Sequence, residues 1–111
     1  MTVEQLRGFG ADVDDALRRC MNNEAFYLNL VERTARDPSF GQLKEAVEAG
    51  DLDRGFELAH ALKGVLANLS LTPILTPVQD ITELLRSRTD TDYSPLIAEM
   101  LAKQQELAGL L

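Results

Sequence analysis

Apolar residues recur at helical spacing along the first third of the chain, between short breaks. Thr2 and Gln5 can form a capping box for a first short helix, before Gly8 and Gly10 interrupt the pattern. Positions 13, 16, 17, 20 and 21 are apolar, which predicts a helix over residues 11–21. Residue 23 is an asparagine that can cap a further helix to about residue 36. The inward positions predicted for that helix are Phe26, Leu30, Val31 and Ala35.

The longest helical run lies in the middle of the chain. Asp37 and Pro38 begin a helix that ends at Gly50, a residue suited to a left-handed C-terminal cap. Asp51 then caps a run that continues to about Leu69. The apolar stripe of this run comprises Leu52, Phe56, Ala59, Leu62, Leu66 and Leu69. Its steps of three and four residues are typical of helices that pack at shallow angles in a bundle.

Two Thr-Pro pairs precede the next helical run. Either Thr72 or Thr76 can begin it. We favour Thr76, because Gln79 completes a capping box and Pro77 then occupies the first helical position. The run ends near Arg86, and a polar loop leads to a last helix from about residue 94. The inner stripe of the last helix includes Ile97, Met100, Leu101, Gln104 and Leu107.

The pattern as a whole predicts an all-α protein. No segment alternates apolar and polar residues with β-branched enrichment, so no strand is expected. Apolar residues make up 45% of the chain and aromatic residues only 5%, which favours packed helices over a sandwich or barrel. We predict an antiparallel four-helix bundle with one or two short additional helices on the N-terminal side, and residues 1–111 as a single domain.

The charge balance excludes several function classes. Eleven basic residues stand against eighteen acidic ones, a net charge of −7, and no basic run could neutralise the phosphates of a nucleic acid or an anionic membrane. No apolar stretch is long enough to span a bilayer, and the N-terminus has no signal-peptide core. We therefore expect a cytoplasmic protein that binds neither nucleic acid nor membrane.

Cysteine and metal chemistry are equally disfavoured. Cys20 is the only cysteine, and it shares a helical stripe with Val13, Leu17 and Met21, so we expect it to be a buried packing residue. The single histidine and single cysteine do not make a convincing transition-metal site.

The single histidine, His60, lies in the middle of the longest predicted helix, at the border between its apolar and polar faces. Its neighbours on the helix surface are Phe56, Glu57, Lys63, Gly64 and Ala67. Because helical side chains lean toward the N-terminus, positions 63, 64 and 67 could cover the imidazole. Two of these residues are Gly and Ala, which leave the ring open to a partner, and the third is a cation within reach of a negative group on the ring.

This arrangement suits an exposed nucleophile. A glycine inside a helix costs roughly 1 kcal/mol relative to alanine, and neither a turn nor a cap explains Gly64. Close approach of another protein is a physical reason to keep the position bare. An exposed imidazole can attack an electrophile, and Lys63 can stabilise the charge of an incoming phosphoryl group.

The alternative is that His60 has no function. A histidine on a helix surface is most often a solvated side chain, Lys63 alone would be an ordinary surface lysine, and Gly64 alone could accommodate packing. The joint spacing of these residues with Ala67 favours a site.

Residues 59–69, AHALKGVLANL, resemble the signature of histidine-containing phosphotransfer (HPt) domains, which is His-x-Leu-Lys-Gly followed by a small residue and Asn-Leu-Gly. Ser70 stands where the family often has glycine. The resemblance extends upstream to GADVDDALRRCMNNEAFYLNLV and downstream to VQDITELLRS, and so covers nearly the whole chain.

The resemblance implies a phosphorelay intermediate. His60 would accept a phosphoryl group from the aspartate of a receiver domain, with Lys63 as charge stabiliser, and Gly64 would leave access. The residues implied for docking are Phe56, Glu57, Ala67 and Asn68, with exposed positions of the helix from residue 23. The receiver would supply Mg²⁺, so no cofactor is expected in this chain. The expected partners are response-regulator receiver domains and a hybrid sensor histidine kinase, and the expected state is a monomer.

Two other functions compete with this one. A histidine kinase fragment is disfavoured, because the glycine-rich ATP-binding boxes are missing and 111 residues leave no room for a nucleotide domain. We therefore expect no ATP-dependent kinase activity. A non-catalytic helical adaptor that binds receivers without transfer is disfavoured by the presence of both His60 and Lys63.

Overall fold

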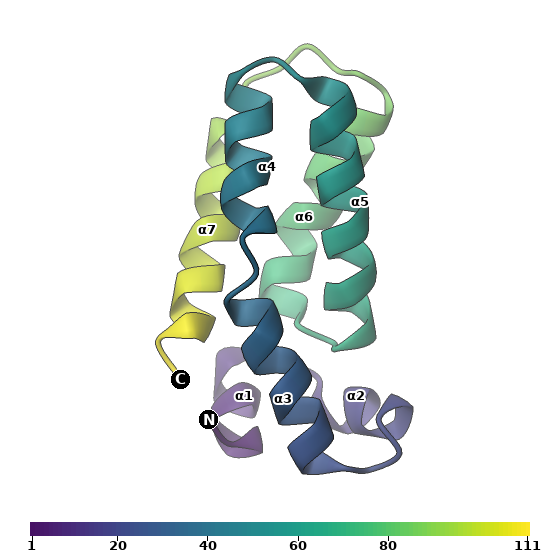
Figure 1. Cartoon of the computed structure of the whole chain (residues 1–111), viewed down its shortest axis with the longest axis vertical. Helices are drawn as coiled ribbons and strands as arrows, with labels where there is room; N and C mark the ends of the chain where they lie inside the picture. The colour runs from purple at the N-terminus through teal and green to yellow at the C-terminus, as the bar shows by residue number, and fades with distance from the viewer.

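The computed structural model describes residues 1–111 and consists of helices joined by short connections, without strands (Figure 1). In chain order the helices are α1 (Val3–Phe9), α2 (Val13–Arg19), α3 (Glu24–Ala35), α4 (Ser39–Glu48), α5 (Leu52–Asn68), α6 (Thr72–Arg86) and α7 (Ser94–Ala108). The predicted all-α fold class is confirmed. None of these helices has both the length and the apolar character needed to cross a bilayer.

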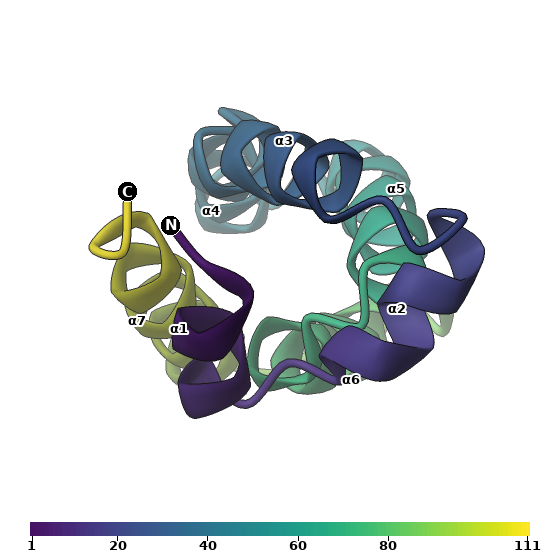
Figure 2. The same cartoon turned by 90° about the horizontal axis from the view of Figure 1, so that it is seen from below.

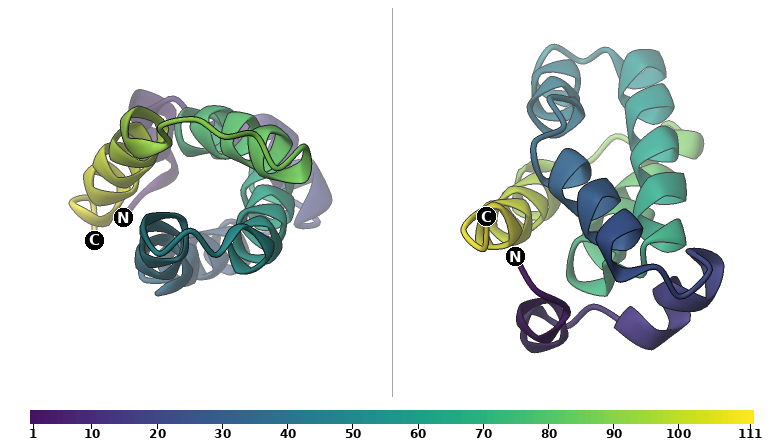
Figure 3. Two further views of the ribbon diagram at one scale, coloured as in Figure 1. Left: turned by 90° about the horizontal axis from the view of Figure 1, so that it is seen from above. Right: turned by 60° about the horizontal axis from the view of Figure 1, so that its bottom comes forward.

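Four of the helices form the body of the molecule. Helices α4, α5, α6 and α7 run alternately up and down, and seen along their axes they form a ring (Figures 1 and 3). Helix α3 continues below α4, and the short helices α1 and α2 lie at that lower end (Figure 2). This arrangement is the predicted antiparallel four-helix bundle with short helices on the N-terminal side.

A single core joins the bundle to the N-terminal helices. The stripe of α5 supplies Ala59, Leu62, Leu66 and Leu69, all buried as predicted, whereas Leu52 and Phe56 are only half-buried. The N-terminal helices add Leu6, Val13 and Ala16 to the same cluster, and the other helices add Phe40, Leu43, Ile74, Val78, Ile81, Leu85, Ile97, Met100 and Leu107. The apolar side chains of all seven helices therefore exclude water from one common interior.

Several of the predicted caps are present. Thr2 and Gln5 form the capping box of α1, and the Asp51 carboxylate accepts a hydrogen bond from the Arg54 N–H at 3.1 Å at the start of α5. Gly50 has a φ of 73°, the left-handed conformation expected at a helix end. These caps are short-range hydrogen bonds, which is why the sequence pattern alone was enough to identify them.

The predicted inner face of α3 is confirmed for Val31 and Ala35 and wrong for Phe26, whose place is taken by Tyr27. The buried residues of α3 include Tyr27, Val31 and Ala35, whereas Phe26 is 52% exposed and Leu30 is half-buried. The Tyr27 hydroxyl donates a buried hydrogen bond of 3.0 Å to the carbonyl of Leu69 at the end of α5. Tyr27 therefore faces α5. Phe26 lies about 100° around the helix from Tyr27 and points to the surface.

The end of α2 also differs from the prediction. The helix ends at Arg19, and Cys20 is buried at its C-terminus as expected. Met21 and Asn22 both have a φ of 57°, so the chain turns through two left-handed residues. Met21 leaves the predicted stripe for this reason and is 90% exposed.

Helix α6 begins one turn earlier than predicted, at Thr72 rather than Thr76. The extra turn places Ile74 at a fully buried position, and burial of a large aliphatic side chain contributes roughly 2 kcal/mol. Pro77 then lies inside the helix, where its missing N–H removes one backbone hydrogen bond. Apolar burial therefore outweighs the alternative cap at Thr76.

Helix α2 holds the C-terminal end of α5. The Arg19 guanidinium donates to the carbonyl oxygens of Asn68 at 2.9 Å and Ala67 at 3.1 Å, two of the groups that have no partner four residues further along the helix. Ser70 has a φ of 53°, a conformation that favours the glycine often found at this point of the HPt signature. Its hydroxyl donates to Asp15 at 2.8 Å, and this bond, together with Arg19, lowers the pKa of Asp15. Ser70 thus occupies a position that favours glycine, and its side chain is bonded to Asp15 there.

The bond between Tyr27 and Leu69 predicts a measurable effect on stability. Tyr27→Phe should lower the free energy of unfolding by about 1 kcal/mol at pH 7, because the buried Leu69 carbonyl loses its donor. Burial raises the pKa of Tyr27 to about 12, whereas an unfolded tyrosine ionises near pH 10, so the stability linked to Tyr27 is complete below about pH 10 and is lost as the pH rises toward about 12. Urea denaturation of both proteins at pH 7 and pH 11 should show the larger loss for the wild type. An equal loss in both would contradict this prediction.

Candidate functional site

The site is built on the exposed face of α5. His60 lies near the middle of this helix and is exposed, while Ala59 and Leu62 beside it are buried. The burial of these neighbours determines which way the helix faces, and so directs the imidazole outward. No hydrogen bond or ion pair within the chain involves the ring; its close contact is with an aromatic neighbour. Both ring nitrogens are therefore free to react.

Phe56 supports the imidazole from one turn before. The two rings are stacked, with centroids 5.6 Å apart and planes 27° apart. On α6, the guanidinium carbon of Arg86 lies 5.1 Å from the centroid of the Phe56 ring, a cation–π contact. Phe56 is half-buried, and through these two contacts it connects the histidine to the last turn of α6.

Lys63 lies one turn after His60 and is paired across to α6. Its ammonium is 3.6 Å from one carboxylate oxygen of Glu83, whose other oxygen is 3.4 Å from Nε of Arg86. One carboxylate therefore bridges two cations beside the histidine. Glu83 and Arg86 were not among the predicted site residues, although the antiparallel connection of α5 and α6 could have placed the end of α6 beside the first half of α5.

Gly64 leaves the surface beside His60 open. A Cβ atom built on Gly64 would meet no atom within 4 Å, so the packing of this chain does not require glycine there. Gly55 on the same helix differs, since a Cβ atom there would contact Leu85 at 3.4 Å and Val47 at 3.5 Å. The other predicted site residues of α5 that are exposed are Glu57, Ala67 and Asn68.

Exposed apolar side chains flank the C-terminal half of α5. Met21 and Phe26 belong to a segment held to the end of α5 on both sides, by Arg19 bonded to Asn68 and by Tyr27 bonded to Leu69. On α5 itself Val65, five residues after His60, is 42% exposed. We refer to Met21, Phe26 and Val65 as the apolar patch. Met21 and Phe26 were both predicted to face inward, so this surface was not predicted from the sequence.

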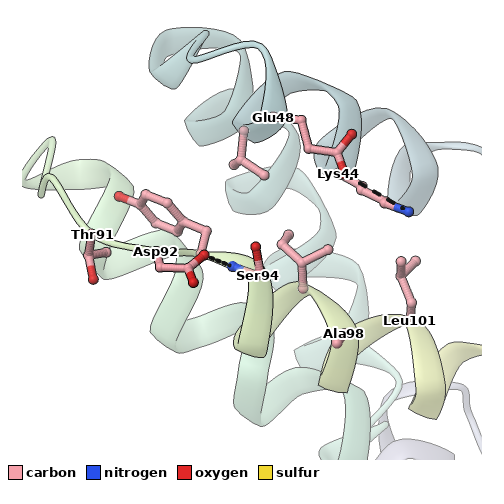
Figure 4. A pocket seen from close by; sticks show the side chains of 10 residues that line it. Lys44, Glu48, Thr91, Asp92, Ser94, Ala98 and Leu101 are labelled. Carbon is pink, nitrogen blue, oxygen red and sulfur yellow. Dashed lines mark hydrogen bonds and ion pairs between the residues drawn. The ribbon is translucent and has the colours of Figure 1, made fainter.

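The larger hollow of the molecule lies away from the histidine. It has a volume of about 330 Å³ and is lined by residues of α4, α7 and the loop before α7, with none from α5 (Figure 4). Lys44 and Glu48 form an ion pair on one wall, and on the other the Asp92 carboxylate accepts a hydrogen bond from the Ser94 N–H. No group of three or more His, Cys, Asp and Glu side chains is placed to hold a metal ion.

A comparison with protein families matches residues 29–110 to the Hpt domain. The matched region runs from within α3 to just past the end of α7 and includes His60 and the residues around it. No curated protein and no solved structure matches the chain.

Proposed function

The chain belongs to the Hpt domain family, which carries phosphoryl groups between proteins of two-component signalling, and from this we propose that His60 is its phosphoacceptor in a multistep phosphorelay. Members of the family exchange phosphoryl groups with receiver domains and are carriers rather than kinases. The observation that supports this role best is a free, exposed imidazole with a cation one turn away and an open surface over Gly64.

The transfer step requires little from this chain. The lone pair of Nε2 of His60 attacks the phosphorus of an aspartyl phosphate on the receiver; the N–P bond forms, the O–P bond breaks, and the electron pair returns to the aspartate carboxylate. Lys63 is the charge stabiliser of the phosphoryl group. The metal ion of the step would be the Mg²⁺ of the receiver, and this chain would contribute no cofactor of its own.

The apolar patch is the proposed centre of receiver docking. Three exposed apolar side chains on the helix of the reactive histidine and at its C-terminal end bury surface when a partner covers them, which is the main driving force of protein association. The polar rim of this docking surface includes Glu57 and Asn68, and the small side chain of Ala67 leaves the approach open. Receiver domains, including that of a hybrid sensor histidine kinase, are the partners we propose for a monomeric, cytoplasmic protein.

The short N-terminal helices are part of the same functional unit in this proposal. Leu6, Val13 and Ala16 of α1 and α2 lie in the core that the matched region forms, and Arg19 holds the end of α5. We therefore treat residues 1–111 as one domain.

The identity of the phosphoacceptor is tested by His60→Gln. This variant should accept no phosphoryl group from a phosphorylated receiver, yet melt within a few degrees of the wild type, because an exposed side chain contributes only a few tenths of a kcal/mol. Acid-labile label on the chain and the melting curve by circular dichroism are the two measurements. Wild type that binds the receiver but is never labelled would indicate a non-catalytic adaptor instead.

The open surface at Gly64 is tested by a pair of substitutions. Gly64→Ala and Gly64→Gln should both melt at or above the wild-type temperature, since removing a helix-interior glycine stabilises a helix by up to about 1 kcal/mol. Only the glutamine should lean toward His60 and slow transfer from the receiver, by on the order of a hundredfold if it displaces the phosphate by about 1 Å. Phosphoramidate, a small donor, should still label both variants. Wild-type transfer rates in Gly64→Gln would contradict the access argument.

The apolar patch is tested by Phe26→Asp. This change should weaken receiver binding, measured by titration calorimetry, by about tenfold or more, because it places a charge in a surface that the partner must cover. Labelling by phosphoramidate should remain at the wild-type rate. Leu111→Asp is the matched control, an exposed apolar residue at the far terminus, and should bind as the wild type does. Equal binding by the Phe26 variant would exclude the patch from the interface.

A further inference from the structure

Glu83 joins two cations beside His60. Its two carboxylate oxygens lie 3.6 Å from the ammonium of Lys63 and 3.4 Å from Nε of Arg86. The Glu83 side chain is 59% exposed, and ion pairs at this level of exposure contribute little to folding stability. The main effect of this bridge is therefore on the electrostatic potential around Glu83, and not on folding stability.

The bridge formed by Glu83, Lys63 and Arg86 lies on one side of the imidazole. Phe56 and Lys63 are four residues before and three residues after His60, so both lie next to it on the helix surface. Both also reach α6, Phe56 by its contact with Arg86 and Lys63 by its pair with Glu83. The two cations and the carboxylate thus border His60 on the side that faces α6.

We propose that Glu83 sets how readily phosphorylated His60 gives up its phosphoryl group, an inference that rests on the proposed function of that histidine. In the unphosphorylated chain, Glu83 neutralises Lys63 and Arg86. A phosphoryl group on Nε2 carries up to two negative charges, attracts both cations and is repelled by the carboxylate. Glu83 competes with it for the same two partners, so phosphohistidine is held less tightly than the two cations alone would hold it.

The expected consequence is a shift in phosphoryl exchange with the receiver. In the onward step the N–P bond breaks, the electron pair stays on Nε2 of a neutral imidazole that keeps its proton on Nδ1, and an O–P bond forms on the aspartate carboxylate. Repulsion by Glu83 raises the free energy of the state in which His60 carries the phosphoryl group, and leaves that of the phosphorylated receiver unchanged. Arg86 is a second cation and acts in the opposite sense, so its removal shifts the exchange equilibrium toward the phosphorylated receiver.

The experiment measures the equilibrium constant for phosphoryl exchange between this chain and a receiver domain. Concentrations are kept below the dissociation constant of the complex, so that the constant reflects the two phosphorylated groups and not docking. Glu83→Gln should move the equilibrium toward His60 by about three- to tenfold, and Arg86→Ala should move it toward the receiver by a similar factor. Both shifts should shrink in about 1 M salt, where charges are screened beyond roughly 3 Å.

Glu106→Gln is the matched control. This glutamate is also exposed, at 54%, and also pairs with a lysine, at 3.3 Å, but it lies on α7 away from the histidine. The control should leave the equilibrium unchanged, and all variants should keep the wild-type melting temperature within a few degrees. A shift of equal size in the control would show that any lost carboxylate acts through net charge, and would overturn the specific role of Glu83.

Labelling by phosphoramidate separates this proposal from the proposed function. If the wild type is labelled and His60→Gln is not, the phosphoacceptor stands, and an unchanged equilibrium in Glu83→Gln then overturns the inference about Glu83 alone. If the wild type takes no label, or the label remains in His60→Gln, both proposals fail. The predicted shift in Glu83→Gln, together with labelling that depends on His60, supports both.

Discussion

The burial of one stripe of α5 between its neighbours is the constraint on which the rest of the molecule depends. Ala59, Leu62 and Leu66 are nearly without solvent exposure, and they leave the helix no freedom to rotate about its axis. A rotation by one residue, about 100°, would carry His60 toward the interior and expose part of this stripe. The same packing that stabilises the bundle therefore determines that the imidazole faces solvent.

The contacts at the lower end of the bundle give the N-terminal helices a role beyond covering the core. Arg19 and Tyr27 both bond to carbonyl oxygens at the end of α5, groups that no helix can satisfy by itself. Between these two anchors the chain passes through the left-handed pair at Met21 and Asn22, which accounts for the exposure of Met21. Stabilisation of the C-terminal end of α5 and exposure of Met21 beside it are thus results of the same contacts.

The electrostatics around His60 differ from those of the chain as a whole. The net charge is −7, yet the charged residues around the imidazole are balanced: Lys63 and Arg86 with the Glu83 carboxylate toward α6, and Glu57 one turn before on α5. Because exposed charges interact mainly within about 10 Å at 0.1 M salt, the local set matters more to a phosphoryl group than the total. The acidic composition led us to expect no nucleic-acid partner but did not describe the site.

The sequence by itself determined what depends on spacing within a single helix. The helical pattern, the caps at Thr2 and Asp51, and the placement of Phe56, Lys63 and Gly64 around His60 follow from the geometry of one α-helix, which is the same in any context. The resemblance to the family was also recognised mainly from residues 59–69 of that helix, and the family match over residues 29–110 agrees with it. These predictions needed no knowledge of how the helices pack.

Only the tertiary structure decided which of several acceptable faces and ends each helix uses. Phe26 and Tyr27 are both apolar enough to be buried, and the Leu69 carbonyl favoured Tyr27. Thr72 and Thr76 are both reasonable starts for α6, and the fully buried Ile74 favoured the earlier one. Glu83 lies beside Lys63 because α6 folds back along α5. Each outcome depends on contacts between residues far apart in the chain, whose free energies local spacing does not contain.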